Sequence, residues 1–445
     1  MYAPVLAVAQ DVRWGRNYEG YGQDPALVAE LGTALFKGLQ GDDLSDPLSM
    51  LATPKHFLGD GGTSWGSSST LDYKLDQGDT RLTEAALREV HLAPYLPSIK
   101  AGALSIMVSF SSWNGAKLHG HKTLLTDVLK GELGFEGFLV SDWGGIYQLG
   151  EDRYAAVVRS IHAGVDMNMV PFEFAQFIED LTRAVGNGDI PLARVDDAVR
   201  RILRAKFALG LFERPFPEAR WETQVGGAAH RGLARQAVQQ SLVLLKNENA
   251  ALPLTKDTAR ILVAGNGADN IGLQAGGWTV TWQGKPGPTT IGTTILAGIR
   301  AVAGGGTEVL YSAKADFPAG TVLADVGIVF LSEKPYAEGL GDRADLALSP
   351  DAEALIRRMN GQARKTVVVM LFGRPRLITD LLALADGWVA AWLPGSEGQG
   401  VADVLFGEAP FSGKLPVAWP ASGDQVPRGA SAVPPLFAAG FGLST

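Results

Sequence analysis

The sequence contains no cysteine, and this absence excludes several classes of site at once. A chain without thiols forms no disulfide, no iron–sulfur cluster and no thiolate zinc site, and it has no cysteine nucleophile. Proteins without cysteine occur in reducing and oxidising compartments alike. The localisation therefore stays open.

Long hydrophobic runs and an excess of positive charge are also absent. No stretch approaches the ~18 consecutive apolar residues of a membrane-spanning helix, and the residues after Met1 do not follow the pattern of a secretion signal. Lys and Arg number 39 against 47 Asp and Glu, a net charge of −8. This balance lacks the positive field that a nucleic acid or an anionic membrane surface attracts, so we expect neither as a partner.

The first half of the chain has the pattern of a parallel α/β fold. Up to about residue 212, short apolar runs alternate with longer helical patterns such as 25–39, which predicts βα units. The runs 104–109 and 137–142 are apolar and end in polar residues, as buried barrel strands do. We predict a (β/α)8-type barrel domain over 1–212. Because such a barrel takes ~250 residues, we expect it to be N-terminally incomplete.

The second half has the pattern of a layered sheet. A helical pattern beginning at Pro191 ends at Gly210, which places a domain boundary near 212 and a linker over 213–240. Predicted strands then follow at 241–247, 261–265, 327–331, 366–370 and 387–392, with helical segments such as 350–358 between them. This alternation predicts an α/β sandwich domain over 241–445.

A carboxylate, Asp142, stands at the end of one predicted barrel strand. Trp143 and two glycines follow it, so a sharp turn can bring an acid and an aromatic ring to the same ligand. A role of Asp142 as cap of the next helix is the structural alternative.

Cationic side chains follow two other predicted strands, in the segments Arg13–Arg16 and Lys55–His56. Arg, Lys and His donate hydrogen bonds to sugar hydroxyls, and aromatic rings cover the apolar faces of a pyranose. Taken singly, a structural ion pair and a core position for His56 are the commoner outcomes. Their place at successive strand ends favours a binding site.

The second domain offers two tryptophans and two loop acids. Trp278 and Trp282 lie four residues apart in a glycine-flanked loop, where they could stack on a flat ligand, although Trp278 could instead cover the local core. Glu333 and Glu338 lie in a loop that follows a predicted strand. Loop acids of this kind are commonly solvated, so this feature alone is weak evidence for a functional site.

Other kinds of site are not favoured. The segment 265–267 matches only part of a dinucleotide fingerprint, and neither a phosphate-binding P-loop nor a serine-hydrolase elbow occurs. His119 and His121 lack a convincing carboxylate partner for a metal. We therefore expect no cofactor and no metal.

Five segments, in chain order, resemble family 3 glycoside hydrolases, and the resemblance covers essentially the whole chain. They are Arg13–Arg16, Lys55–Phe57, Ser141–Trp143, Gly277–Gly284 and Leu393–Gly400. The likeness is greatest to two-domain β-glucosidases and exo-β-glucan glucohydrolases, which combine a barrel with a following sandwich domain. It implies that Asp142 is the nucleophile and that Glu338, in a Glu-x-x-Gly-Asp loop, is the acid/base.

The resemblance also implies roles for the binding residues. Arg16, Lys55 and His56 would bind hydroxyls of the terminal glucose. Trp143 and Trp282 would enclose the next sugar, with Trp278 close by. The implied activity is that of a retaining exo-acting β-glucosidase, which releases glucose from the non-reducing end of β-glucosides or β-glucan oligosaccharides by double displacement.

A retaining glycosidase needs two carboxyl groups ~5–5.5 Å apart whose pKa values differ. We expect nearby cations, Arg16 and Lys55 with His56, to keep Asp142 ionised. Glu338, on a less cationic loop, would keep its proton near neutral pH.

Two alternatives remain open. A β-N-acetylglucosaminidase of the same family would carry a His-Asp pair after the Lys-His segment, and Ser64–Ser68 offers no histidine there. A catalytically impaired carbohydrate-binding fragment would follow from an incomplete barrel. Phe110 stands where many relatives have Tyr, which removes a hydrogen-bond donor. Linkage preference and oligomeric state are not indicated.

Overall fold

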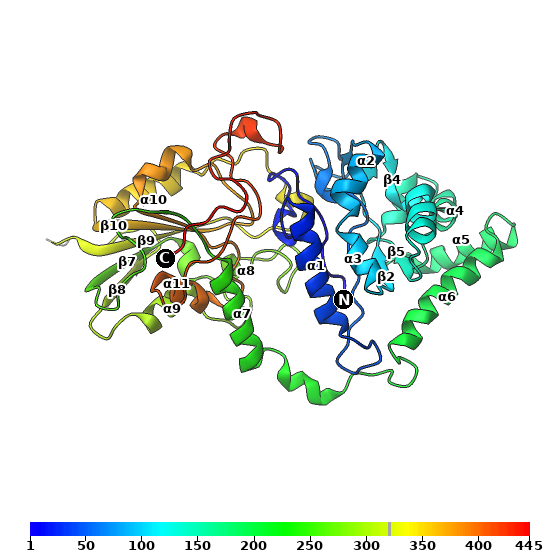
Figure 1. Ribbon diagram of the computed structural model, residues 1–445, viewed down its shortest axis with the longest axis horizontal. Coiled ribbons are helices and arrows are strands. Elements are labelled where there is room, and N and C mark those ends of the chain that lie inside the picture. Colours follow the sequence, from blue (N-terminus) through cyan, green and yellow to red (C-terminus); the bar gives the residue numbers. More distant parts are fainter. Residues whose placement is uncertain (319–321) are drawn as a thin grey trace. The chain divides into compact units, whose positions relative to one another are not determined.

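The computed structural model describes residues 1–318 and 322–445, which form two compact units, Met1–Pro217 and Glu218–Thr445 (Figure 1). The helices of unit 1 are α1 (Pro25–Gln40), α2 (Glu84–Leu87), α3 (Tyr95–Lys100), α4 (Arg153–Ala163), α5 (Phe174–Gly186) and α6 (Leu192–Ala208). Its strands are β1 (Asp79–Thr80), β2 (Ser105–Met107), β3 (Ser112–Trp113), β4 (Ala116–Lys117) and β5 (Phe138–Val140).

The helices of unit 2 are α7 (Ala228–Ser241), α8 (Ile271–Ala275), α9 (Ile295–Val302), α10 (Pro350–Asn360) and α11 (Gly398–Leu405). Its strands are β6 (Val243–Asn247), β7 (Arg260–Ala264), β8 (Glu308–Ser312), β9 (Ala324–Ser332), β10 (Ala363–Leu371) and β11 (Gly387–Ala390).

A parallel array of short extended segments forms the centre of unit 1. Strands β2 and β5 pair in parallel. Single parallel bridges extend the array on both sides; they join Val5 to Lys55, Phe57 to Val108, and Val140 to Met167. Five segments therefore lie side by side in chain order, which confirms the predicted βα arrangement. Within the described residues of unit 1, no strand pairing closes the array into a full barrel.

The helices that cover the parallel array of unit 1 form where the sequence pattern predicts them. Helix α1 begins at Pro25 because Asp24 accepts the N–H of Ala26 at 3.0 Å, and it buries Val28 and Phe36 against the array. Helix α6 likewise follows the predicted pattern. The predicted helical segment around 124–129 is present as a π-helix, Thr123–Glu132.

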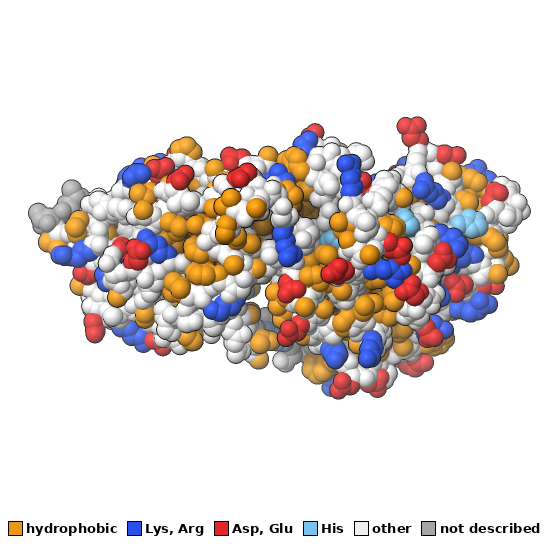
Figure 2. All heavy atoms as spheres, turned by 45° about the horizontal axis from the view of Figure 1, so that its top comes forward, with side chains coloured by type: hydrophobic (Ala, Val, Ile, Leu, Met, Phe, Trp, Pro, Cys, Tyr) orange, Lys and Arg blue, Asp and Glu red, His pale blue; other side chains and the backbone are white. Residues whose placement is uncertain are grey.

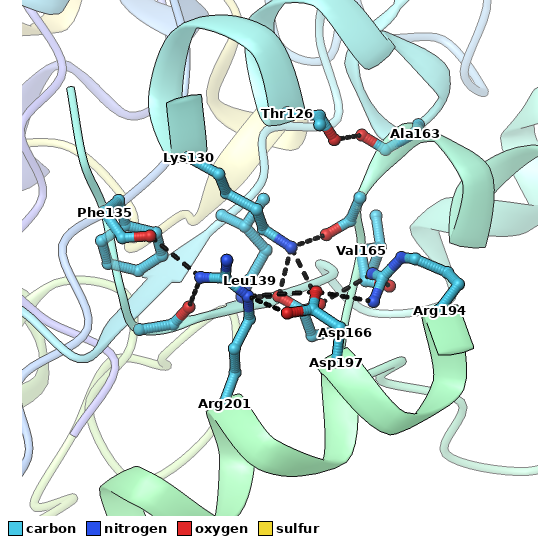
Figure 3. Close-up of polar contacts among 12 residues, drawn as sticks. Thr126, Lys130, Phe135, Leu139, Ala163, Val165, Asp166, Arg194, Asp197 and Arg201 are labelled. Atoms are coloured by element: carbon cyan, nitrogen blue, oxygen red, sulfur yellow. Dashed lines mark hydrogen bonds and ion pairs between the residues drawn. The ribbon is translucent and has the colours of Figure 1, made fainter. Parts of the chain in front are cut away.

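One buried carboxylate, Asp166, connects the array to its covering helices (Figure 3). It accepts hydrogen bonds from the backbone N–H of Leu139 in β5 at 2.8 Å, from Lys130 Nζ at 2.8 Å and from Arg194 Nη2 of α6 at 2.7 Å. Burial lowers the pKa of Lys130 to about 8, and the charge of Asp166 opposes this shift. The position of β5 therefore depends on a charge cluster that is nearly closed to water.

We predict that Asp166→Ala lowers the free energy of unfolding by about 3–5 kcal/mol, because it leaves the buried Lys130 without its carboxylate and Arg194 with only its longer pair to Asp197 at 3.3 Å. Equilibrium unfolding in urea measures the change. Asp196→Asn is the matched control. Asp196 pairs with Arg200 at 3.9 Å on the exposed face of α6, so this change should cost less than about 1 kcal/mol. Equal effects of the two substitutions would contradict the prediction.

Unit 2 is built on a six-stranded sheet in the order β6-β11-β10-β9-β7-β8. All neighbours are parallel except β6 and β11. Helices α7, α9 and α11 cover one face and α10 covers the other (Figure 1). In β10, Val367 and Val369 pack on the first face, whereas Val368 and Met370 pack on the second. The predicted α/β sandwich is confirmed.

The segment predicted as a linker, 213–240, includes most of α7. Arg235 of α7 makes a bidentate ion pair with the buried Asp403 of α11, at 2.6 Å for both bonds, and Val238 lies in the core of unit 2. Helix α7 therefore packs as part of unit 2. The domain boundaries themselves stay predictions.

The face of the molecule shown in Figure 2 has no concentration of one charge. On the face displayed in Figure 2, Lys and Arg alternate with Asp and Glu, and hydrophobic side chains lie among them. No helix in 1–318 or 322–445 has both the length and the apolar character needed to cross a bilayer. The same residues contain no cluster of three His, Asp or Glu side chains that could hold a metal ion.

Candidate active site

Asp142 follows β5 directly, where the backbone is fixed by its neighbours. Ser141 Oγ accepts the N–H of Met169 at 2.7 Å and donates to the carbonyl of Asp142 at 2.9 Å. The Asp142 carboxylate accepts the N–H of Trp143 at 2.7 Å. The next helical turn is preceded by Gly144, without a side-chain cap. The capping alternative for Asp142 was therefore wrong.

A neutral histidine holds the backbone of Asp142. The N–H of Asp142 donates to His119 Nε2 at 3.0 Å, and burial lowers the pKa of His119 to about 3. A side chain at Gly145 would meet the His119 ring at 2.5 Å, so only glycine allows this close approach. The sequence analysis considered His119 only as a metal ligand, because its backbone partner has no signature in the sequence.

His56 lies on the other side of the carboxylate. Its Nε2 is 3.7 Å from Asp142 Oδ2, and its Nδ1 is 2.8 Å from Asp60 Oδ2. Burial lowers the pKa of His56 well below its ordinary value, with the charges of Arg16 and Lys55 adding to the effect. The expectation that His56 belongs to the cationic set was wrong: it is neutral. Burial also raises the pKa of Asp60 to about 7, so His56 and Asp60 form a buried pair of low net charge.

Arg16 and Lys55 supply the positive charge near Asp142. Arg16 is buried and makes a bidentate ion pair with Glu19, at 2.9 and 2.8 Å. Burial raises the pKa of Asp142, whereas Arg16, the Trp143 N–H and Lys55 lower it. The cations act as expected, but burial outweighs them, so the pKa of Asp142 lies above its ordinary value. The sequence analysis missed Glu19, although its spacing from Arg16 was a usable signal.

Two aromatic rings form an exposed apolar rim beside Asp142. Trp143 is 57% exposed and Phe172 is 77% exposed, and their rings meet edge to face at 6.1 Å between centroids. Such a pair offers area for stacking on a sugar or an aryl group. The sequence analysis singled out Trp143 and missed Phe172, which no strand-end pattern marks.

In unit 2, Glu338 begins a short 3-10 helix, Glu338–Gly341, in the loop that follows β9. Its backbone is in the left-handed region, with φ +54°. Trp278 and Trp282 are 47% and 48% exposed, and the N–H of Trp278 donates to the carbonyl of Trp282 at 2.9 Å. Both rings therefore leave about half of their area open for stacking.

A buried polar network supports the Glu338 loop. Tyr336 donates its hydroxyl proton to Glu333 Oε1 at 2.9 Å, and Arg374 donates to the Tyr336 hydroxyl at 3.0 Å and to the carbonyl of Gly341 at 2.5 Å. Glu333 also accepts from Arg376 at 3.1 Å. Of the two loop glutamates, Glu333 thus belongs to the supporting network.

Each unit brings together its own share of the predicted site residues. Unit 1 gathers Arg16, Lys55 and His56 around Asp142, with Trp143 at the rim. Unit 2 carries Glu338 in the loop that follows β9 and the two tryptophans in the loop between α8 and α9.

Both units match domains of a known protein family. Residues 1–205 match the glycosyl hydrolase family 3 N-terminal domain, and residues 242–445 match the glycosyl hydrolase family 3 C-terminal domain. The chain belongs to glycosyl hydrolase family 3. The expected family is thereby confirmed.

Relatives of this family 3 chain are known in sequence and in structure. It is 33% identical to a lysosomal beta glucosidase of Dictyostelium discoideum over 100% of the chain and 58% of that protein. A mutant exo-1,3/1,4-beta-glucanase from a Pseudoalteromonas species is 42% identical, with a TM-score of 0.93 over 100% of this chain and 73% of that one. A beta-glucosidase from Listeria innocua in complex with glucose is 29% identical, with a TM-score of 0.88 over 100% and 65%. The chain spans about three fifths of the length of the curated relatives it matches first, 58% and 59%.

We predict that His119 makes this family 3 chain sensitive to acid. Because the pKa of His119 is about 3 in the folded chain and near 6.5 when unfolded, the unfolded state binds more protons between these values. The free energy of unfolding should therefore fall, by about 1 kcal/mol per pH unit from this group, as the pH drops below about 6.5. His119→Gln, which can still accept the N–H of Asp142 but does not titrate, should reduce this slope in urea unfolding.

His162→Gln is the control, since His162 is exposed on α4. Its pH slope is the baseline with which the slope of the His119 variant is compared. An unchanged slope in the His119 variant would show that His119 is not held neutral.

Proposed function

We propose that the chain acts as a retaining exo-acting β-glucosidase, which releases glucose from the non-reducing end of β-glucosides or β-glucan oligosaccharides. The observation that carries the proposal is the setting of Asp142. This carboxylate stands at the end of β5, oriented by the Trp143 N–H, beside Arg16, Lys55 and a neutral His56. A fixed and poorly solvated carboxylate is suited to attack a carbon centre.

In the first step, an oxygen of Asp142 attacks the anomeric carbon, and the bond from that carbon to the leaving oxygen breaks. Glu338 gives its proton to the leaving oxygen, so the aglycone departs as an alcohol and the sugar stays bound as an ester of Asp142. In the second step, Glu338 takes a proton from water while the water oxygen attacks the anomeric carbon. The ester bond breaks, glucose leaves with retained configuration, and both carboxyl groups return to their first state.

Two cations favour the ionised form of Asp142 that the first step needs. Burial raises the pKa of Asp142, but Arg16 and Lys55 act against this shift. A neutral His56 suits the same site, because its ring can form hydrogen bonds with sugar hydroxyls without adding a charge.

The substrate class is supported by the donors and rings around the two acids. Arg16, Lys55 and His56 suit the hydroxyl groups of a terminal glucose. Trp143, Trp278 and Trp282 suit the apolar faces of the following sugar or of an aryl aglycone. The relatives described as beta-glucosidases and as an exo-1,3/1,4-beta-glucanase support the same class, and the Listeria protein has been solved with laminaribiose.

We predict that Asp142→Ala and Glu338→Ala each lower turnover of an aryl β-glucoside by about 10³-fold or more, because each removes one of the two acids of the double displacement. Added azide separates the two roles. In Asp142→Ala, azide should attack from the vacated face and give the α-glucosyl azide, whereas in Glu338→Ala it should give the β-glucosyl azide. Product analysis by NMR distinguishes the anomers.

Glu136→Ala is the control, since Glu136 is exposed and lies before β5. It should retain full activity. Near-normal turnover in either acid variant would refute the assignment of that residue. Calorimetry that showed glucose or laminaribiose binding to the parent chain, without hydrolysis, would instead support the carbohydrate-binding alternative.

We further predict that Trp143→Ala raises KM for laminaribiose by about tenfold and changes KM for methyl β-glucoside much less. The loss of one stacking ring costs about 1 kcal/mol or more, and only the disaccharide has a second sugar to stack. Initial-rate kinetics on the two substrates measure the difference. Equal effects on both would place Trp143 outside the binding site for the second sugar.

A further inference from the structure

We propose that Gln283 is a positioning residue for Glu338, an inference that rests on the acid/base role proposed above. The side-chain amide of Gln283 makes two hydrogen bonds with the backbone of Ala337. Its Nε2 donates to the Ala337 carbonyl at 3.2 Å, and its Oε1 accepts the Ala337 N–H at 2.9 Å. A bidentate amide pair of this kind holds the backbone on the residue before Glu338 as a strand partner would.

The Glu338 segment needs such support because its own conformation is unfavourable. The left-handed region is unfavourable for a residue other than glycine, and Glu338 has φ +54°. Leu340, two residues further on, is exposed and borders an open cavity of about 990 Å³, so its side chain adds little packing to the segment. The backbone direction at Glu338 therefore depends on its anchors.

The anchors lie at both ends of the segment. Arg374, which is fully buried, donates to the Tyr336 hydroxyl and to the carbonyl of Gly341. The Gln283 amide holds Ala337 between these points. Because Arg374 is part of the buried core network, its loss would disturb folding. Gln283 is only half-buried and can be changed with less damage.

Gln283 itself is carried by a tight loop. Gly284 has φ +67°, and a side chain there would meet the carbonyl oxygen of Gly276 at 2.3 Å and Pro335 at 2.9 Å. The loop from Gly276 to Gly284 therefore closes on itself and lies against the start of the Glu338 loop.

Substrates with different leaving groups distinguish a positioning role of Gln283 from a purely structural one. A structural role would change the rates of both substrates alike. An alkyl or sugar leaving group needs the proton of Glu338, whereas 2,4-dinitrophenolate leaves without one. A displaced Glu338 should therefore slow formation of the glycosyl ester from a disaccharide and spare the dinitrophenyl glucoside.

The test compares kcat/KM for laminaribiose and for 2,4-dinitrophenyl β-glucoside in Gln283→Ala and in Gln283→Met, which keeps the length of the side chain. We expect a loss of about 30-fold or more on laminaribiose and less than about threefold on the dinitrophenyl substrate. The Met variant keeps the test valid if the Ala variant folds poorly.

Gln362→Ala is the matched control. Gln362 also donates two hydrogen bonds to backbone carbonyls, those of Ala315 and Arg358 at 2.9 Å, but it precedes β10 at the opposite end of the sheet. Its loss should affect both substrates equally.

Glu338→Gln separates this inference from the proposed function. If that variant shows no selective loss on laminaribiose, Glu338 is not the acid, and the proposed function fails together with the inference. If Glu338→Gln is selective while both Gln283 variants lower the two rates equally or leave them unchanged, the positioning role of Gln283 is overturned and the proposed function stands.

Discussion

The buried carboxylate of Asp166 is the constraint on which the architecture of unit 1 depends most directly. It accepts the N–H of Leu139 in the middle of β5, and it pairs with Lys130 and Arg194 on two covering helices. Two cations and one carboxylate are far from water there, so each is costly to separate from the others. Because β5 ends two residues before Asp142, this cluster fixes the direction in which the strand delivers its carboxylate. A structural ion cluster at the middle of the strand thus serves the chemistry at its carboxyl end.

The pKa of Asp142 is set by two opposing effects, burial and nearby positive charge. Burial removes water from the carboxylate and raises its pKa, and the same burial brings Arg16 and Lys55 close enough to act against that shift. The histidines beside Asp142 take no part in this balance, since burial holds His56 and His119 neutral. Their contribution is geometric: His119 fixes the backbone of Asp142, and His56 places a ring nitrogen opposite its side chain. Charge and orientation are therefore supplied by different residues.

Sequence reasoning succeeded where the signal was local. Asp142 could be predicted because an apolar run followed by a polar residue marks the end of a buried parallel strand. Helices α1 and α6 could be predicted from periodicity and from their end signals. His119 and Gln283 could not, because each acts on a backbone group, 23 and 54 residues away, and a backbone partner has no residue identity. The neutral state of His56 was missed for a different reason: it depends on burial by the whole unit, which the local sequence does not contain. Edge strand β8 was missed because its apolar run, Val309–Tyr311, is only three residues long.

The two proposed catalytic acids are held in different ways, and the difference matches their proposed tasks. Asp142 continues a strand, and its carboxylate is fixed by the adjacent N–H of Trp143, which suits a nucleophile that must approach one carbon along one line. Glu338 belongs to a loop that is anchored at Tyr336, Ala337 and Gly341, while Leu340 beside it is exposed. An acid/base must serve first the leaving oxygen and then a water molecule, which do not occupy identical positions. Firm anchors on either side of Glu338 would allow a small adjustment of the carboxyl group between the two steps while keeping it directed at the same bond.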